Sequence, residues 1–72
     1  MSDLQTRLLA AHQTGDTVKL AHLYAEAAQA ADTEAAEGFF LTHAYIFALE
    51  AGNNVANTYR QRLVEMGREP PT

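Results

Sequence analysis

The amino-acid sequence predicts an all-α protein of four antiparallel helices, arranged as two stacked helical hairpins. Apolar residues recur at intervals of three and four positions through the 72-residue chain, which is the period of a half-buried α-helix. No segment shows the strict alternation of apolar and polar residues that marks a β-strand. Gly15, Gly52 and Gly67 each follow an apolar segment, where helices commonly end. Turns this short place consecutive helices antiparallel.

The first hairpin is expected over residues 2–31. Ser2 and Gln5 have the spacing of a capping box, which predicts the start of the first helix. Gly15 suits the left-handed conformation that follows a helix C-terminus, so the first helix should end just before it. Asp16 comes next, and its carboxylate is suited to accept hydrogen bonds from the free amides at the start of the second helix.

The second hairpin is expected over residues 33–67, followed by a tail over residues 68–72. Its boundaries are predicted from residues that commonly cap helices: Asp32 or Thr33 before the third helix, Gly52 after it, Asn53 or Asn54 before the fourth, and Gly67 after that. Pro70 and Pro71 prevent any continuation of the fourth helix. We therefore expect a single helical domain over residues 1–72.

The third helix is apolar nearly all round, which distinguishes it from the other three. A helix of this kind is normally covered on more than one side, so it should be the central element. We expect Phe40 and Phe47 to be buried. The same side of the helix carries three alanines, Ala36, Ala44 and Ala51. Because these side chains are small, they let a neighbouring helix approach closely while the rings fill the space between.

Composition and charge exclude several classes of protein. The chain has no cysteine, which excludes a disulfide scaffold and thiol chemistry. Its net charge is −4, and Arg60, Arg62 and Arg68 form only a mild basic patch, so nucleic-acid binding is not expected. No apolar run approaches the ~20 residues of a membrane span, and no signal-peptide run follows the N-terminus. The sequence therefore predicts a cytoplasmic protein without membrane contact.

Candidate catalytic and metal-binding residues are sparse. His22 and Glu26 lie four positions apart on one face of the second helix, but a metal site needs three or four converging ligands. Ser2 is the only serine and is expected to cap a helix. The sequence also contains no glycine-rich phosphate loop and no nucleophile motif. We therefore expect no enzyme activity, no bound metal and no cofactor.

A weak internal repeat relates the two hairpins. Residues 8–16 align with residues 45–53, 37 positions later, and each segment ends an apolar helix with glycine followed by an acidic or amide residue. Further positions match a known repeat pattern: Gly15, Leu20, Tyr24 and Ala27 in the first unit, and Leu41 and Tyr45 in the second. With these residues the chain resembles the tetratricopeptide-repeat family. It lacks that family's tryptophan, and Asp32 stands where a proline usually closes the repeat.

The resemblance implies a scaffold for protein contacts rather than an active site, with a groove lined by the first helix of each unit. The residues expected to bind a partner are Leu9, His12, Phe39, His43, Tyr45 and Ile46. No basic residue lies between Lys19 and Arg60, so a basic or amphipathic partner is favoured over an acidic peptide. Two interpretations of His43 stay open. It hydrogen-bonds a backbone carbonyl or Tyr24 in the core, or it serves with His12 as a polar anchor in the groove.

Two hairpins have too few helices to cover every side of the third helix. Repeat architectures generally need about three or more repeats, so the uncovered part is expected to bind a second copy of the chain. This part should include aromatic or aliphatic residues such as Phe39, Ile46, Tyr45 or Leu49. We therefore predict a small non-enzymatic interaction or adaptor module that forms a homodimer, with its other protein partner unknown. The alternative interpretation is a stand-alone four-helix bundle that acts as a regulatory subunit of a larger enzyme.

Overall fold

The computed structural model describes residues 3–67 and confirms the all-α class. Four helices make up the fold: α1 (Asp3–Thr14), α2 (Thr17–Gln29), α3 (Glu34–Glu50) and α4 (Ala56–Glu65). Residues 3–67 contain no strand. The predicted capping box at the start of α1 depends on Ser2, which lies outside the described residues.

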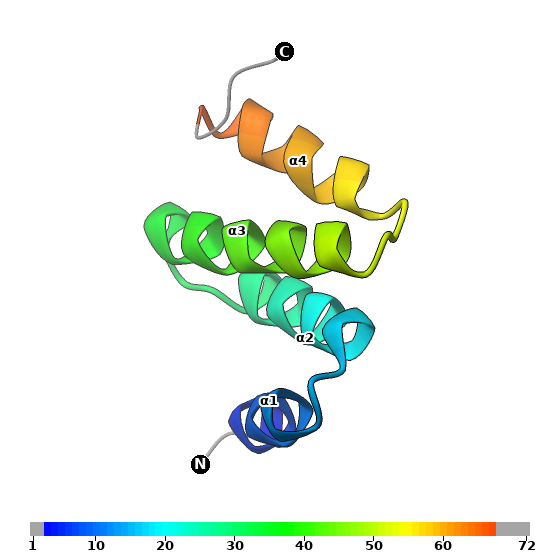
Figure 1. The fold of residues 1–72 in the computed structure, drawn as a ribbon. Coiled ribbons are helices and arrows are strands. Elements are labelled where there is room, and N and C mark those ends of the chain that lie inside the picture. Colours follow the sequence, from blue (N-terminus) through cyan, green and yellow to red (C-terminus); the bar gives the residue numbers. More distant parts are fainter. Residues whose placement is uncertain (1–2, 68–72) are drawn as a thin grey trace.

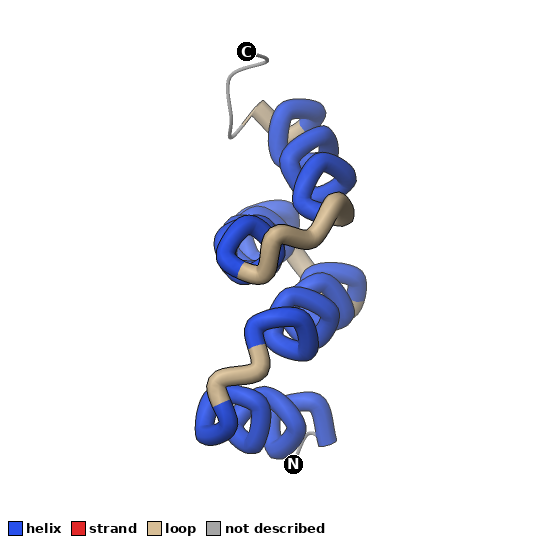
Figure 2. The backbone as a smooth tube through the Cα atoms, turned by 45° about the vertical axis from the view of Figure 1, so that its right-hand side comes forward, coloured by secondary structure: helices blue, strands red, loops and turns tan. Residues whose placement is uncertain are grey.

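The helices follow one another as an open array (Figure 1). α2 and α4 run leftward and α3 runs rightward in that view, so these three are antiparallel neighbours. α1 is seen more nearly along its axis and therefore crosses α2 obliquely. Figure 2 shows α1 and α3 displaced to one side of the array, and α2 and α4 to the other. The Cα atoms span 34 × 29 × 12 Å, and α1 and α4 lie at opposite ends, so the array does not close into a bundle.

Two of the predicted caps are present at the starts of α2 and α3. The amide of Lys19 donates to the carboxylate of Asp16 over 3.1 Å. The amide of Ala36 donates to the hydroxyl of Thr33, also over 3.1 Å. Each cap satisfies one of the amides that a first helical turn leaves without a partner, so the sequence defines where both helices begin.

The predicted cap of α4 is wrong. Neither Asn53 nor Asn54 is the N-cap, because that position belongs to Val55, whose side chain makes no capping hydrogen bond. The side chain of Asn53 instead accepts from the amide of Val55 over 3.0 Å. Asn53 therefore closes a short turn ahead of the helix, since an Asn side chain readily bonds a backbone amide two residues on.

The core is built mainly from small side chains. Its larger cluster joins α2, α3 and α4 and comprises Ala21, Ala28, Leu41, Ala44, Ala48, Ala56, Tyr59 and Leu63. Ala44 and Ala48 of α3 are fully buried, with 0% of their surface exposed. Such small side chains let helix backbones approach closely. A second cluster, Ala11, Leu20 and Leu23, holds α1 against α2. α3 packs against both α2 and α4, so it is an inner helix, as predicted; α2, which packs against both α1 and α3, is the other.

The predicted burial of Phe40 and Phe47 is wrong, since both rings are only partly buried. Ala44 occupies the buried side of α3, and the close contact there leaves no room for a ring. Phe40 and Phe47 lie at the edge of this contact and pack beside Tyr24 of α2. Phe47 and Tyr24 border both hydrophobic clusters, so these two rings connect the α1 end of the core to the rest.

The predicted turn conformations at Gly15 and Gly52 are confirmed, with φ of 68° at each. A Cβ atom built at Gly52 meets no atom within 4 Å, so the constraint is the backbone alone. We predict that Gly52→Ala lowers the free energy of unfolding by about 1–2 kcal/mol, measured by urea denaturation. Gly52→Asn is the matched control and should cost less, because Asn tolerates this conformation. Equal stability of the parent and Gly52→Ala would contradict the assignment.

Candidate functional site

Aromatic rings from three helices form one connected cluster on the side of the array that carries α1 and α3. Its members are His12 of α1, Tyr24 of α2, and Phe39, Phe40, His43 and Phe47 of α3. Neighbouring ring centroids lie between 4.5 Å (Phe39 to His43) and 6.4 Å (Tyr24 to Phe40) apart. These are the separations at which aromatic pairs attract one another beyond their buried area.

Tyr24 is the centre of this aromatic cluster. Its ring stacks on Phe47, with centroids 5.6 Å apart and planes 13° from parallel, and on His43, with centroids 5.1 Å apart. Its hydroxyl is hydrogen-bonded to Nε2 of His12 over 2.9 Å. The His12 ring also meets Phe47 edge-on. Tyr24 therefore fixes α1 and α3 relative to α2 through a single side chain.

The structure distinguishes between the two hydrogen-bonding partners expected for His43. Its Nδ1–H donates to the carbonyl oxygen of Phe39 over 2.9 Å, within the same helix. Tyr24 stacks on the His43 ring but bonds His12 instead. The backbone bond holds the imidazole of His43 beside the exposed ring of Phe39, 4.5 Å between centroids. This pair forms the outer edge of the aromatic cluster.

A line of exposed side chains continues from the aromatic cluster along α3. Phe39, Ile46 and Leu49 expose 57%, 45% and 55% of their surface, and Thr42 between them is also exposed. We call these four residues the α3 ridge. Their spacing of three, four and three positions places them along one side of the helix. The buried Ala44 lies on the other side, so the ridge faces away from the core.

The structure brings together most of the residues predicted to bind a partner. His12, Phe39 and His43 belong to the aromatic cluster, and Ile46 lies on the α3 ridge. Leu9 is 61% exposed on α1, three positions before His12. We call the surface formed by these residues and Leu49 the α1/α3 face.

Tyr45 does not join the α1/α3 face, because it is partly buried and packs against the larger core cluster. Tyr24 was missed as a binding residue, and Leu49 was expected only as part of the uncovered surface of α3. For Leu49 a signal was present, because it lies three positions after Ile46 and shares its side of the helix. For Tyr24 no local signal was available, since its role depends on how α1 and α3 meet α2.

A hollow of about 250 Å³ lies between the helices beside the aromatic cluster. Its lining is Leu4, Gln5 and Leu8 of α1, Ala27 of α2 and Phe40 of α3. Phe40 belongs to both the hollow and the aromatic cluster, so the two are continuous. Its walls are apolar except for the side chain of Gln5, which suits an apolar side chain of a partner.

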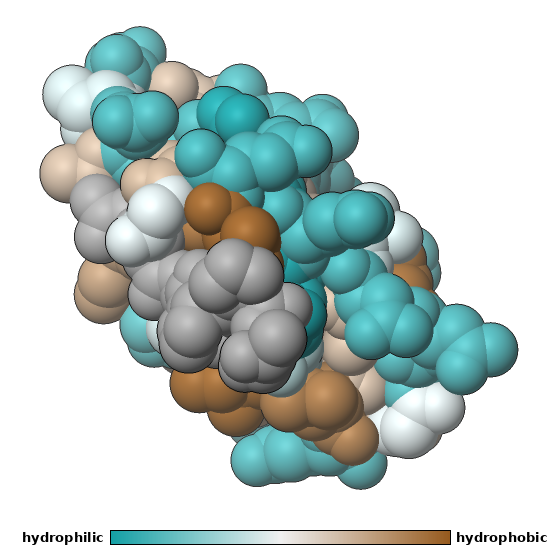
Figure 3. Space-filling model, turned by 90° about the horizontal axis from the view of Figure 1, so that it is seen from above, coloured by the Kyte–Doolittle hydropathy of each residue, from teal (hydrophilic) through white to brown (hydrophobic). Residues whose placement is uncertain are grey.

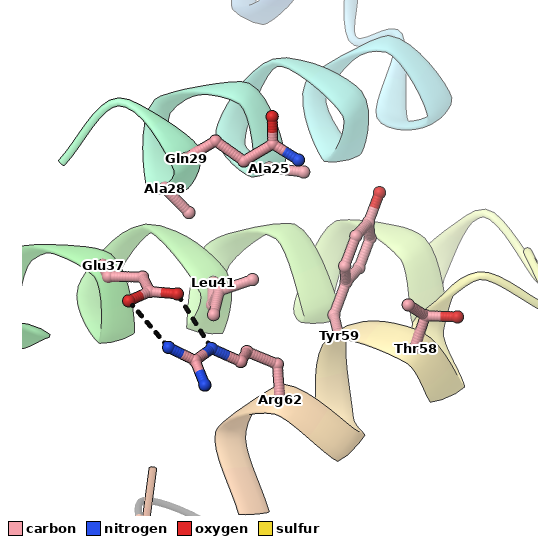
Figure 4. Close-up of a pocket in the computed structure, with 8 residues that line it drawn as sticks. All are labelled: Ala25, Ala28, Gln29, Glu37, Leu41, Thr58, Tyr59 and Arg62. Carbon is pink, nitrogen blue, oxygen red and sulfur yellow. Dashed lines mark hydrogen bonds and ion pairs between the residues drawn. The ribbon is translucent and has the colours of Figure 1, made fainter. Parts of the chain in front are cut away.

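A second hollow, of about 270 Å³, lies between α2 and α4 over α3 (Figure 4). Glu37 and Leu41 line it from the side of α3 that turns away from the ridge. Figure 4 shows the Tyr59 ring extending towards α2, and burial raises the pKa of its hydroxyl. The carboxylate of Glu37 accepts two hydrogen bonds from Arg62, over 2.9 Å and 3.2 Å, along the α3–α4 edge.

Charged side chains elsewhere are engaged in ion pairs or scattered. Arg7 pairs with Glu26 over 3.1 Å and ties α1 to α2, so Glu26 is not free to bind metal with His22. Within residues 3–67 there is no group of three or more His, Asp or Glu residues placed to hold a metal ion. Seen from the α4 end, polar side chains cover most of the surface, and apolar ones form separate patches (Figure 3).

In the part of the chain that the structure describes, no helix is long and apolar enough to cross a membrane. Comparison with family models, with curated proteins and with solved structures found no match. The resemblance to tetratricopeptide repeats therefore depends on the residues of this chain alone.

We predict that Tyr24→Phe lowers the free energy of unfolding by about 0.5–1 kcal/mol, because it removes only the hydrogen bond to His12. Tyr24→Ala should cost about 2–3 kcal/mol, because the ring contacts are also lost. Urea denaturation measures both values. Combining Tyr24→Phe with His12→Ala should cost less than the sum of the single changes, since both remove the same bond. Strict additivity would show that the two side chains do not interact.

The Glu37–Arg62 pair predicts a specific pH dependence. Hydrogen bonding from Arg62 lowers the pKa of Glu37 below its ordinary value of 4.5. The pair therefore contributes stability above about pH 4.5, and this contribution is lost as the pH falls through the lowered pKa. We expect Glu37→Gln to lose less stability than the parent between pH 6 and pH 3. Arg62→Gln, which removes the other member of the pair, should flatten the profile in the same way; the prediction fails if Glu37→Gln keeps the parent's profile.

Proposed function

We propose that this chain is a small non-enzymatic protein-interaction module that binds a protein partner through its α1/α3 face. The observation that carries the proposal is the α3 ridge, where Phe39, Ile46 and Leu49 each expose roughly half of their surface in one line. A contiguous apolar surface of this kind marks an interaction site, whereas isolated exposed apolar residues do not. The cytoplasmic location predicted from the sequence stays a prediction.

The aromatic cluster supports the same interpretation. Aromatic side chains are enriched at the centres of protein interfaces. Phe39 and His43 are already held in place, by ring contact with each other and by the bond from His43 to the backbone. Because these side chains are ordered before binding, little conformational freedom is lost when a partner covers them. The adjoining hollow at Phe40 offers room for an apolar side chain of that partner.

The charges around α3 restrict how a partner lies on it. Glu34 and Glu50 are exposed at the two ends of the helix, and α3 carries no lysine or arginine. A partner that places further acidic groups at these ends is disfavoured by repulsion. The face therefore suits a partner with an apolar centre and neutral or basic groups near Glu34 and Glu50.

The proposal predicts that binding depends on the ridge. We would capture partners from an extract of the native host with the affinity-tagged parent, with Leu49→Glu and with Val18→Glu, and identify them by mass spectrometry. Val18 is the matched control, since it is 44% exposed but lies on α2. Proteins that bind the ridge should fall by about tenfold or more with Leu49→Glu, because an unpaired charge is then buried at the interface. They should persist with Val18→Glu.

Circular dichroism should show that both variants remain helical, because both substitutions are at exposed positions. If Leu49→Glu captures the same proteins at the same level as the parent, the ridge is not the binding surface. A loss with Val18→Glu equal to that with Leu49→Glu would equally contradict the proposal.

A further inference from the structure

We infer that the α3 ridge binds the α3 ridge of a second copy of this chain, with the two helices antiparallel. The inference rests on the proposed function and gives the identity and the orientation of one partner. It concerns the four residues Phe39, Thr42, Ile46 and Leu49, which are all exposed in the isolated chain.

The spacing of the ridge makes it complementary to itself. Phe39 and Leu49 each lie five positions from Ala44, and Thr42 and Ile46 each lie two positions from it. A two-fold axis at the level of Ala44 therefore places Phe39 against Leu49 of the second copy. The same axis places Thr42 against Ile46. The steps of three, four and three positions are also those of a heptad seam, whose side chains interlock between two helices.

The acidic end of α3 favours the antiparallel orientation. A parallel pair would place Glu50 beside Glu50 of the second copy, and no basic side chain of α3 is available to separate them. An antiparallel pair moves these carboxylates to opposite ends of the interface. Each Glu50 then lies level with Gly38 of the facing helix, about one turn from the exposed Glu34 of that helix, so like charges are further apart than in a parallel pair.

The position of α1 widens the surface available to the second copy. α1 and α3 lie on the same side of the array (Figure 2), so a second copy on the ridge lies on the side that also carries α1. A stable interface typically buries about 800 Å² on each partner. The chain exposes 4730 Å², so an interface of this size takes about a sixth of its surface.

The mass of the purified chain in solution is the first test. Light scattering coupled to size exclusion at micromolar concentration should give twice the chain mass of 7.9 kDa. Ile46→Glu and Leu49→Glu should each shift the protein to the monomer mass, because each buries an unpaired charge between the two ridges. The control Val18→Glu should remain a dimer. A monomeric parent overturns the inference, and so does a dimer that survives both ridge substitutions.

Crosslinking tests the orientation, and the chain has no cysteine to interfere. Phe39→Cys and Leu49→Cys should crosslink to each other when the two variants are mixed, using a short thiol-reactive reagent. Neither should crosslink efficiently to itself. The reverse pattern, in which each variant crosslinks to itself and the mixture adds nothing, shows a parallel pair and overturns the antiparallel arrangement.

The failure of this inference can be distinguished from the failure of the proposed function. If the parent is monomeric and Leu49→Glu abolishes the capture of a different protein, the second copy is not the partner. The proposed function then still holds. If the parent is monomeric and no captured protein depends on the ridge, both this inference and the proposed function are wrong.

Discussion

The close contact of α2 with α3 through alanine side chains is the constraint on which the remaining structure depends. Ala44 and Ala48 are completely buried where the two helices meet, with Ala21 and Ala28 of α2 in the same cluster. Helices that approach this closely leave no room for large side chains between them. The rings of α3 are therefore displaced to the edges of the contact, where Tyr24 gathers them into the aromatic cluster. The surface proposed to bind partners thus results from the way the core is packed.

Ion pairs orient the outer helices more than they stabilise them. Arg7 and Glu26 connect α1 to α2, and Arg62 and Glu37 connect α4 to α3. These pairs lie at the surface, where such interactions contribute little to the free energy of folding. The attachment of α1 depends instead on Ala11 and its neighbours in the smaller cluster, together with the aromatic contacts of His12. Because few side chains hold α1 against α2, a partner that contacts α1 and α3 together would strengthen the attachment of α1.

The two sides of α3 have different chemical character, and this difference directs the functional interpretation. One side lines the hollow between α2 and α4, where polar groups such as Glu37 already bond partners within the chain. The other side carries the ridge, whose apolar side chains have no covering helix within residues 3–67. An uncovered apolar surface beside ordered aromatic rings is a better basis for protein binding than a hollow whose charged groups are already paired within the chain.

The sequence by itself determined the four helices and most of their ends. Caps and turns depend on residues close together in the chain, so Asp16, Thr33 and Gly52 were sufficient to locate them. The apolar character of α3 likewise indicated a central helix, and the exposure of Phe39 and Ile46 could be anticipated from it.

Only the tertiary structure decided which sides of α3 its neighbours cover. The periodicity of a helix that is apolar all round does not distinguish its sides, so Phe40 and Phe47 were placed too deep, and Tyr45 was placed on the wrong face. The link between His12 and Tyr24 joins residues of different helices, and its formation depends on the oblique crossing of α1 over α2. Local signals define where helices begin and end, whereas the contacts between helices define which side chains remain exposed to bind a partner.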